Sequence, residues 1–267
     1  MTDLKGKTAL VTGSVQGIGL GIAIELAKAG ARIAVHGLPN DPGADAACKT
    51  LIQAGAPDAK FFGADVMSPA AIHALMAEIE AWGGIDILVN NAGIQHAAPI
   101  ADMPDAKWDA IIAINLSSCF HTMKAALPGM AERGYGRVIN IASVHGMVGS
   151  TEKAPYVAAK HGLVGMSKVV ALEYADQGDP TQGGVTINCI APGWTETALI
   201  EPQIEARAKA AGGDRTQGVA DLLAEKQPSK RMTKPSELGA LAVFLCTPAA
   251  HNMTGATLPM DGGWTAQ

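Results

Sequence analysis

Three polar side chains between residues 141 and 160 could together move a proton to or from an alcohol oxygen. Ser143 lies just past the buried, strand-like run 137–141. Tyr156 and Lys160 lie four residues apart in a run of small and apolar residues that predicts a helix, so they share one helix face. A fixed cation close to a phenol favours the ionised phenol, which suits acid–base work. An ordinary helix pair with no catalytic part is the alternative.

The bulk composition limits the classes of protein that this chain can represent. It has 267 residues, 48% hydrophobic and 17% charged, with a formal net charge of −5, which fits one α/β domain over 1–267. Mild acidity without a basic cluster argues against nucleic-acid partners, and the lack of a purely apolar run of about eighteen residues argues against a membrane span. The N-terminus has no signal-peptide pattern, and the four scattered cysteines form no CxxC pair, so we expect a cytoplasmic protein with reduced thiols.

A glycine-rich turn follows the first predicted strand, 8–12. The run from Gly13 to Gly19 reads GSVQGIG, and a helix through 29 and a strand at 32–36 come next. Glycines at a strand-to-helix turn let the backbone approach a phosphate, whose charge the helix N-terminus favours. The spacing is GxxxGxG rather than GxGxxG. We predict a dinucleotide site here, with a purely structural turn as the alternative.

The end of the second predicted strand bears on which dinucleotide binds. An acid there would bind the adenosine ribose hydroxyls, and an Arg would accept a 2′-phosphate. The sequence 36–41 is HGLPND, without Arg or Lys, and Gln16 stands in the glycine turn where a base could have stood. This lack of a cation favours NAD over NADP. The usual acid is also missing, because Asp41 comes several residues late.

Strand-like and helix-like runs alternate along the rest of the chain. Seven strands and their helices predict an α/β fold: a doubly wound parallel seven-stranded sheet of the Rossmann type, with helices on both faces. Residues 195–228 become charged, helical and interrupted by glycines, which indicates a small helical substrate lid. The helix that carries Tyr156 is apolar nearly all round, so we expect its outer side to face a second subunit.

Polar residues at two further strand ends and inside one helix have two interpretations each. Asp65 could accept from an adenine amino group or simply lead a helix. The run 90–93, NNAG, suits a floor beneath a cofactor, although a turn uses the same residues. Asn115 stands in the apolar helix that starts at residue 105 and must find partners there. It is either a buried structural residue or part of a relay that holds a water molecule.

These motifs in this order resemble the short-chain dehydrogenase/reductase superfamily along the whole chain. The matching pieces are TGSVQGIG at 12–19, NNAG at 90–93, Asn115, Ser143, YVAAK at 156–160 and PGW at 192–194. The resemblance implies that Ser143 polarises the substrate oxygen and that Tyr156 is the general acid/base. It implies that Lys160 assists Tyr156 and binds the nicotinamide ribose, and that Asn115 holds a relay water. The implied cofactor-binding residues are Gly13, Ser14, Gln16, Gly17, Ile18, Gly19, Leu38, Asp65, Val66, Asn91, Ala92, Gly93, Tyr156, Lys160, Pro192, Gly193, Trp194, Thr195 and Thr197.

A narrower resemblance, to bacterial D-3-hydroxybutyrate dehydrogenases, rests on six stretches. These are GIQHAAPI (93–100), ASVHGMV (142–148), EKAPYVAAKHG (152–162), PGWTET (192–197), EKQPS (225–229) and DGGWTA (261–266). It implies a homotetramer that oxidises D-3-hydroxybutyrate with NAD. It also implies that the substrate carboxylate is gathered by Gln95, His145, Lys153 and Gln203, beside the reacting oxygen at Ser143 and Tyr156. Such an acid needs a cation and several donors for its carboxylate.

Other interpretations remain open at this level. Lys153, His145 and Gln203 could each be an ordinary surface or turn residue, and Trp194 could shield the nicotinamide or simply pack. The same fold and catalytic set also serve other hydroxy acids, sugar acids and acyl thioesters, and a catalytically silent dinucleotide sensor is the non-enzyme alternative. The histidines show no ligand spacing with carboxylates, so no catalytic metal is expected. The loop 179–184, DPTQGG, looks inserted at a face remote from the site.

Overall fold

The computed structural model describes residues 3–266 and contains one seven-stranded sheet in the order β3-β2-β1-β4-β5-β6-β7. Every neighbouring pair is parallel. The alternation of strand-like and helix-like runs predicted this doubly wound sheet, and the prediction is confirmed. The strands are β1 (Thr8–Val11), β2 (Arg32–Gly37), β3 (Ala59–Gly63), β4 (Ile87–Asn90), β5 (Tyr135–Ile141), β6 (Gly184–Pro192) and β7 (Thr257–Met260).

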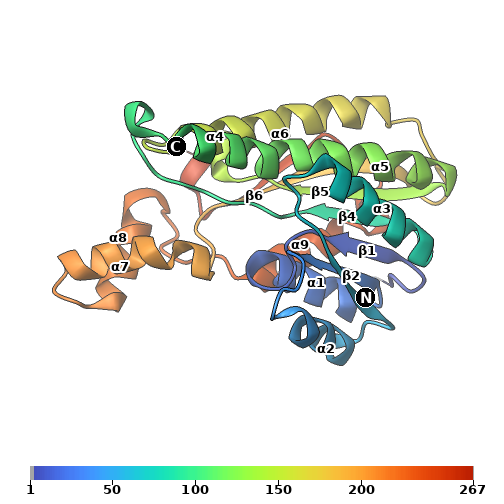
Figure 1. The fold of residues 1–267 in the computed structure, drawn as a ribbon, viewed down its shortest axis with the longest axis horizontal. Helices are drawn as coiled ribbons and strands as arrows, with labels where there is room; N and C mark the ends of the chain where they lie inside the picture. The colour runs from blue at the N-terminus through green and yellow to red at the C-terminus, as the bar shows by residue number, and fades with distance from the viewer. Residues whose placement is uncertain (1–2, 267) are drawn as a thin grey trace.

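Helices cover both faces of the sheet, as Figure 1 shows. Successive strand residues feed two separate apolar clusters, since Ala9 and Val11 pack on one face while Leu10 packs on the other. The first face carries α1 (Gly17–Lys28), α2 (Ala44–Ala54) and α9 (Pro235–Leu245). The second carries α3 (Pro69–Gly83), α5 (Ser118–Glu132) and α6 (Ala154–Glu173), with α4 (Asp105–Ile112) packed against α6.

The chain order reverses beside β1, which pairs with β2 on one side and with β4 on the other. Ala9 is in register with Ile33 of β2 and with Ile87 of β4. The connections leaving β1 and β4 therefore diverge and open a crevice at the carboxyl edge of the sheet, where ligands of open α/β sheets bind. The loop 179–184 lies at the opposite edge, since Asp179 N–H donates to the Gly134 carbonyl just before β5 begins.

The helical segment Asp105–Glu132 is long and apolar enough, by composition, to cross a bilayer: it has 28 residues and a mean hydropathy of 1.3 over its most apolar window. In the folded chain it packs against α3 and α6. A π-helical turn, η2 (Ala113–Ser117), interrupts it and separates α4 from α5. The segment therefore belongs to a helix layer of the sheet, and the turn marks the position of Asn115.

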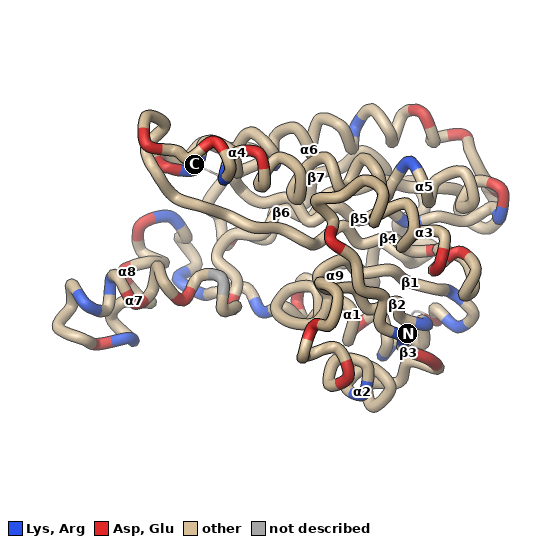
Figure 2. Tube along the Cα trace, viewed as in Figure 1, with Lys and Arg blue, Asp and Glu red and all other residues tan. Residues whose placement is uncertain are grey.

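A helical hairpin formed by α7 (Glu201–Ala210) and α8 (Arg215–Lys226) projects from the body of the molecule (Figure 1). It carries its own apolar cluster, in which Ile204 and Leu222 pack with Trp194 of the preceding loop. Two bidentate ion pairs, Arg207–Glu225 and Arg215–Glu201, bridge its elements. Figure 2 shows both basic and acidic residues along it. The hairpin occupies the segment predicted as a lid.

Several predicted boundaries are wrong by one or two residues. Strand β5 begins at Tyr135 rather than 137, β1 ends at Val11 rather than 12, and β2 ends at Gly37 rather than 36. The helix with Tyr156 runs over Ala154–Glu173. Short 3-10 turns complete the chain: η1 (Ile100–Asp102), η3 (Val144–Gly146), η4 (Ala198–Ile200), η5 (Pro248–Ala250) and η6 (Trp264–Ala266).

Candidate active site

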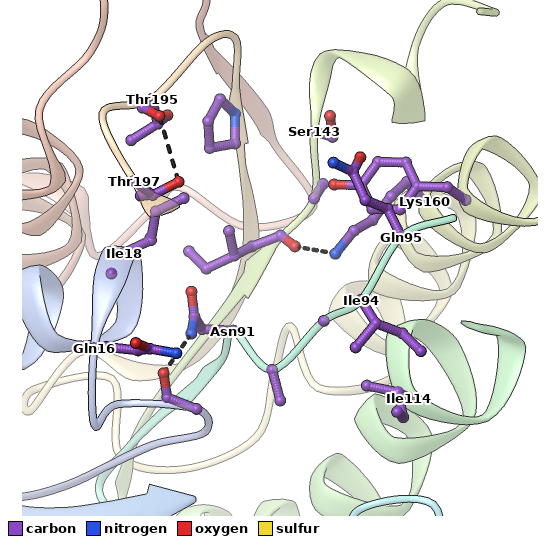
Figure 3. Close-up of a pocket in the computed structure, with 18 of the residues that line it drawn as sticks. Gln16, Ile18, Asn91, Ile94, Gln95, Ile114, Ser143, Lys160, Thr195 and Thr197 are labelled. Carbon is purple, nitrogen blue, oxygen red and sulfur yellow. Dashed lines mark hydrogen bonds between the residues drawn. The ribbon is translucent and has the colours of Figure 1, made fainter. Parts of the chain in front are cut away.

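A cavity of about 440 Å³ occupies the crevice at the carboxyl ends of the strands. It extends from the glycine turn, β2 and β3 at one end to the catalytic candidates at the other. In Figure 3, Gln16 and Asn91 lie at one side of this view, and Ser143, Lys160 and Gln95 gather at the other. The volume suits a cofactor or drug-sized ligand. Most of the residues predicted from the two resemblances therefore share one cavity.

The glycine turn is shaped to hold a phosphate. Gly13 and Gly17 have φ values of +64° and +61°, a conformation that favours glycine. A Cβ atom on Gly19 would collide with the Gly13 carbonyl oxygen, so the third glycine permits the close packing of the turn. Within residues 3–266, no side chain caps the N-terminus of α1 and no acid lies in its first turn, which leaves its amides free for an anion.

His36 joins three cofactor-side segments. The ring atom Nδ1 accepts from Gly13 N–H at 3.0 Å, and Nε2 lies 3.2 Å from the Ala64 carbonyl. The main-chain N–H of His36 donates to Ser14 Oγ at 3.0 Å. The first two bonds together require the neutral Nε2–H tautomer. Burial lowers the pKa of His36 to about 4, so the ring stays uncharged at neutral pH. It thereby ties the glycine turn to the ends of β2 and β3.

The NNAG turn lines the crevice next to the glycine turn. Asn91 Nδ2 donates to the carbonyls of Thr12 and Gly13 at 2.8 and 3.1 Å. The backbone N–H groups of Asn91 and Ala92 donate to Thr12 Oγ1. These bonds fix the end of β4 against the glycine turn, so the two segments form one continuous part of the cavity lining.

Ser143, Tyr156 and Lys160 converge on the other end of the cavity. Lys160 is buried, donates from Nζ to the Ile141 carbonyl at 2.7 Å and lies 5.7 Å from the centroid of the Tyr156 ring. Ser143 follows β5 and accepts from His145 N–H at 3.2 Å. The hydrogen bond from Lys160 to Ile141 holds α6 against the end of β5, so a phenol, a hydroxyl and an ammonium line the same end of the cavity.

Asn115 is fully buried in the π-helical turn and does not line the cavity. Its Oδ1 accepts from Ile94 N–H at 2.9 Å and its Nδ2 donates to the Ile94 carbonyl at 2.9 Å. Of the two interpretations given by the sequence, the side chain serves the structural one. A relay through this residue would have to use its main-chain carbonyl.

A second cavity, of about 600 Å³, lies between the lid and the body and collects the four residues expected to bind a carboxylate. Gln95, His145 and Lys153 line both cavities, and Gln203, from α7, lines the second. Burial, followed by the nearby Lys153, lowers the pKa of His145 to about 4. Burial and the charge of Arg207 lower the pKa of Lys153. The pocket thus offers the neutral imidazole of His145 and the ammonium group of Lys153, which is buried and repelled by Arg207. A bound anion would offset that repulsion.

Two tryptophans lie where the cavities meet. Trp194 and Trp264 line both, and their ring centroids are 5.4 Å apart. Lys153 Nζ lies 5.4 Å from the Trp194 centroid, and His145 packs edge-on against Trp264 at 5.5 Å. Trp194 therefore packs and lines the cavity, and a shield for the nicotinamide stays a prediction. Trp264 was missed as a site residue, although its DGGWTA stretch was recognised.

The remaining predicted residues separate into those that line the cavity and those that support it. Ser14 and Gly19 do not line it: Ser14 is buried as the acceptor for His36, and Gly19 packs the turn.

Two residues of the cavities were not predicted. Asp41 comes late after the strand in the sequence, yet it lines the first cavity, and Arg207 lines the second. Among residues 3–266, no three metal-ligating side chains gather into a site. The predicted cofactor-binding residues that do line the cavity are Gly13, Gln16, Gly17, Ile18, Leu38, Asp65, Val66, Asn91, Ala92, Gly93, Tyr156, Lys160, Pro192, Gly193, Trp194, Thr195 and Thr197.

This fold and this site are those of an oxidoreductase that uses a nicotinamide dinucleotide, and the chain belongs to the short-chain dehydrogenase/reductase family. Residues 13–265 match the family model described as enoyl-(acyl carrier protein) reductase. Two similar relatives are each named D-beta-hydroxybutyrate dehydrogenase. The one from Cupriavidus necator is 54% identical over 99% of this chain and 100% of its own length, and the one from Rhizobium meliloti is 45% identical over 98% and 99%. A solved structure from Agrobacterium tumefaciens, provisionally described as a gluconate dehydrogenase, superposes with a TM-score of 0.87 at 35% identity, over 98% of this chain and 97% of that one.

Proposed function

We propose that this protein interconverts D-3-hydroxybutyrate and acetoacetate with NAD. One observation carries the proposal: Lys153, His145 and Gln95 line the same cavity as Ser143 and Tyr156. A short acid bound by its carboxylate would therefore bring its C3 oxygen to the proton-transfer residues. The two relatives named D-beta-hydroxybutyrate dehydrogenase support the same substrate.

The proton chemistry follows from the positions of three side chains. NAD, when bound, supplies the hydride acceptor. Ser143 donates a hydrogen bond to the substrate oxygen and fixes its direction. Tyr156 removes the hydroxyl proton in oxidation and returns it in reduction. Lys160 is held by the Ile141 carbonyl and stabilises negative charge on the phenol oxygen. The proton then leaves toward solvent along the Lys160 side of the cavity.

The carboxylate set selects and orients the acid. Lys153 supplies the charge, while Gln95 and neutral His145 supply directed hydrogen bonds. Gln203 lies on the hairpin and completes the set from the far side of the second cavity. Because these groups bind the end of the acid that does not react, they position the reacting carbon without taking part in proton transfer.

The residues at the glycine turn fit a dinucleotide, since uncapped α1 amides and two left-handed glycines form a cradle for a pyrophosphate. NAD rather than NADP is proposed because the end of β2 carries no Lys or Arg.

The test measures reduced-cofactor absorbance with D- and L-3-hydroxybutyrate, each with NAD and with NADP. We expect turnover with the D-isomer and NAD, and at least tenfold lower kcat/KM in every other combination. Equal rates with both isomers would overturn the assigned substrate geometry. Dinucleotide binding without turnover of any hydroxy acid would favour a silent sensor.

A larger hydroxy acid is the second candidate, because the cavity beyond Lys153 is about 600 Å³ and contains Arg207 and Glu225. That space and those polar groups exceed the needs of a four-carbon acid. The similarity to a structure provisionally described as a gluconate dehydrogenase points the same way. Comparing kcat/KM for D-gluconate and D-3-hydroxybutyrate separates the two, and a higher value for gluconate would replace the first proposal.

We also propose that the protein assembles as a homotetramer. Leu172 and Val169 on α6 are 80% and 55% exposed, and Phe120 on the neighbouring α5 is 45% exposed. These apolar side chains on two neighbouring helices suit a face covered by another copy of the chain.

A further inference from the structure

Asp41 is brought back to the end of β2 by a tight turn. Asp41 N–H donates to the Leu38 carbonyl at 3.2 Å, and Asn40 has a φ of +61°, which lets the chain reverse within four residues. The Asp41 side chain is then fixed, because its Oδ1 accepts from Gly43 N–H at 2.9 Å. This single bond leaves Oδ2 as an available acceptor.

The carboxylate stands beside Gly37, the last residue of β2. A Cβ atom on Gly37 would lie 3.2 Å from Asp41 Oδ2 and 2.9 Å from Val15 Cγ2 of the glycine turn. The space that a side chain at residue 37 would enter is therefore bounded by the Asp41 carboxylate. Both Gly37 and Asp41 line the 440 Å³ cavity. The sequence places no acidic residue at the end of β2, but in the folded chain the Asp41 carboxylate lies there.

The charges around this end of the cavity all favour a diol over a phosphate. Of the side chains that line the cavity in the described part of the chain, the only Lys or Arg residues are Lys153 and Lys160, which lie at the catalytic end. His36, beside the glycine turn, is neutral because burial lowers its pKa to about 4. A carboxylate here accepts hydrogen bonds from ribose hydroxyls and repels a 2′-phosphate dianion that finds no cation.

We propose that Asp41 binds the adenosine ribose hydroxyls and sets the preference for NAD over NADP. The inference rests on the proposed function as a nicotinamide-dependent dehydrogenase, and it assigns cofactor choice to a residue four positions beyond the strand end. Leu38, also in the cavity wall, supplies the carbonyl that closes the turn.

The test compares NADH and NADPH binding to the full-length protein by calorimetric titration, without any hydroxy acid. We expect the wild-type protein to bind NADH at least a hundredfold more tightly than NADPH. In Asp41→Asn the amide oxygen keeps the bond from Gly43 but the charge is lost. NADH affinity should fall about tenfold, because a hydrogen bond to a charged acceptor is weakened, and NADPH affinity should rise, because the repulsion of its phosphate is removed. Asp45→Asn is the matched control: it removes the same charge from an exposed position in the first turn of α2 and should leave the ratio unchanged.

The outcomes separate this inference from the proposed function. Equal loss of both affinities in Asp41→Asn would mean that Asp41 only maintains the turn, and the assignment would be overturned. Wild-type protein that binds NADPH as tightly as NADH would overturn it too. Wild-type protein that binds neither dinucleotide would defeat both proposals. A shifted ratio without turnover of hydroxybutyrate would support Asp41 while rejecting the proposed substrate.

Discussion

Asn115 and Ile94 are joined by a reciprocal pair of hydrogen bonds, side-chain amide to main-chain peptide, each 2.9 Å long. The residues are 21 positions apart in the chain and come from a π-helical turn and from the loop after β4. This pair holds the loop that continues into Gln95. The helix layer thereby positions one of the proposed carboxylate ligands.

Asn115→Ala should therefore destabilise the fold and loosen substrate binding together. Two buried bonds are lost, so we expect the free energy of unfolding to fall by about 1–3 kcal/mol. The KM for D-3-hydroxybutyrate should rise because Gln95 is no longer fixed. Urea denaturation and steady-state kinetics measure the two effects. Asn188→Ala is the matched control, since Asn188 is equally buried and bonded to main-chain atoms near β7. An unchanged KM in Asn115→Ala would contradict the positioning role.

Tyr156→Phe should abolish turnover while NADH binding persists. Removal of the phenol oxygen deletes the proton acceptor, and general acid–base groups contribute about 10²–10⁴ in rate. The measurements are kcat with NAD and D-3-hydroxybutyrate and the dissociation constant for NADH. Tyr174→Phe, at the end of the same helix and outside the cavity, should keep normal activity. Retention of more than a tenth of kcat in Tyr156→Phe would remove Tyr156 from the mechanism.

Lys153→Ala should raise KM for the acid at least tenfold and leave kcat/KM for a neutral secondary alcohol nearly unchanged. The reason is that Lys153 is proposed to bind only the carboxylate. In the wild-type protein, burial and Arg207 lower the pKa of Lys153, so KM for the acid should rise with pH below the ordinary lysine range. The variant should lack that rise. Lys168→Ala, on the exposed side of α6, is the control. Equal losses with acid and alcohol would argue against carboxylate recognition.

His36 should make the fold sensitive to mild acid. Its pKa is lowered to about 4 in the folded state, so between about pH 6.5 and pH 4 the unfolded chain binds a proton that the folded chain does not. Stability is therefore present above pH 6.5 and declines as the pH falls toward 4, by up to about 3 kcal/mol from this group. His145, also lowered to about 4, adds its own share.

The measurement is the free energy of unfolding at a series of pH values for the wild-type protein and for His36→Asn. The asparagine keeps one donor and one acceptor but does not titrate, so the variant should show a shallower decline. His73→Asn, at an exposed position of α3, is the control. Superimposable pH profiles of wild-type protein and His36→Asn would show that His36 contributes nothing to acid sensitivity.

Leu172→Asp should shift the proposed tetramer toward smaller species. Leu172 is the most exposed of the large apolar side chains in the described chain, and a charge there would be costly if a second copy covered it. Sedimentation velocity reports the species present. Lys49→Glu, at an exposed position of α2 on the other face of the sheet, is the control for added negative charge. A wild-type protein that sediments as a monomer would end the assembly proposal.

The sheet could be predicted because strands covered on both faces read as continuous apolar runs separated by turn residues. The site residues that follow strand ends, such as Ser143 and Asn91, could be placed for the same reason. Asp41 could not, because its position depends on a left-handed residue and a turn that return the chain to Gly37. The hydrogen-bond partner of Asn115 could not be predicted either, because no local pattern in the helix points to Ile94.

Burial also determines the charge state of side chains, which residue types alone do not fix. The sequence shows His36 only as a histidine at a strand end, but in the structure both ring nitrogens are hydrogen-bonded and burial keeps the ring neutral. Arg207 read as one charged residue among many in the lid. Only the folded hairpin shows it facing Lys153 across the second cavity and paired with Glu225.

The helical hairpin is held together by its own packing and ion pairs. Ile204 and Leu222 pack inside it, and Arg207–Glu225 and Arg215–Glu201 fasten its elements. Its internal order thus does not depend on a bound acid. A movement that brings Gln203 over the substrate requires changes only in the connecting segments, with little loss of conformational entropy when the substrate arrives. If the hairpin closes over the substrate as proposed, it would move as a rigid body, at a rate set by the connecting segments rather than by the folding of a loop.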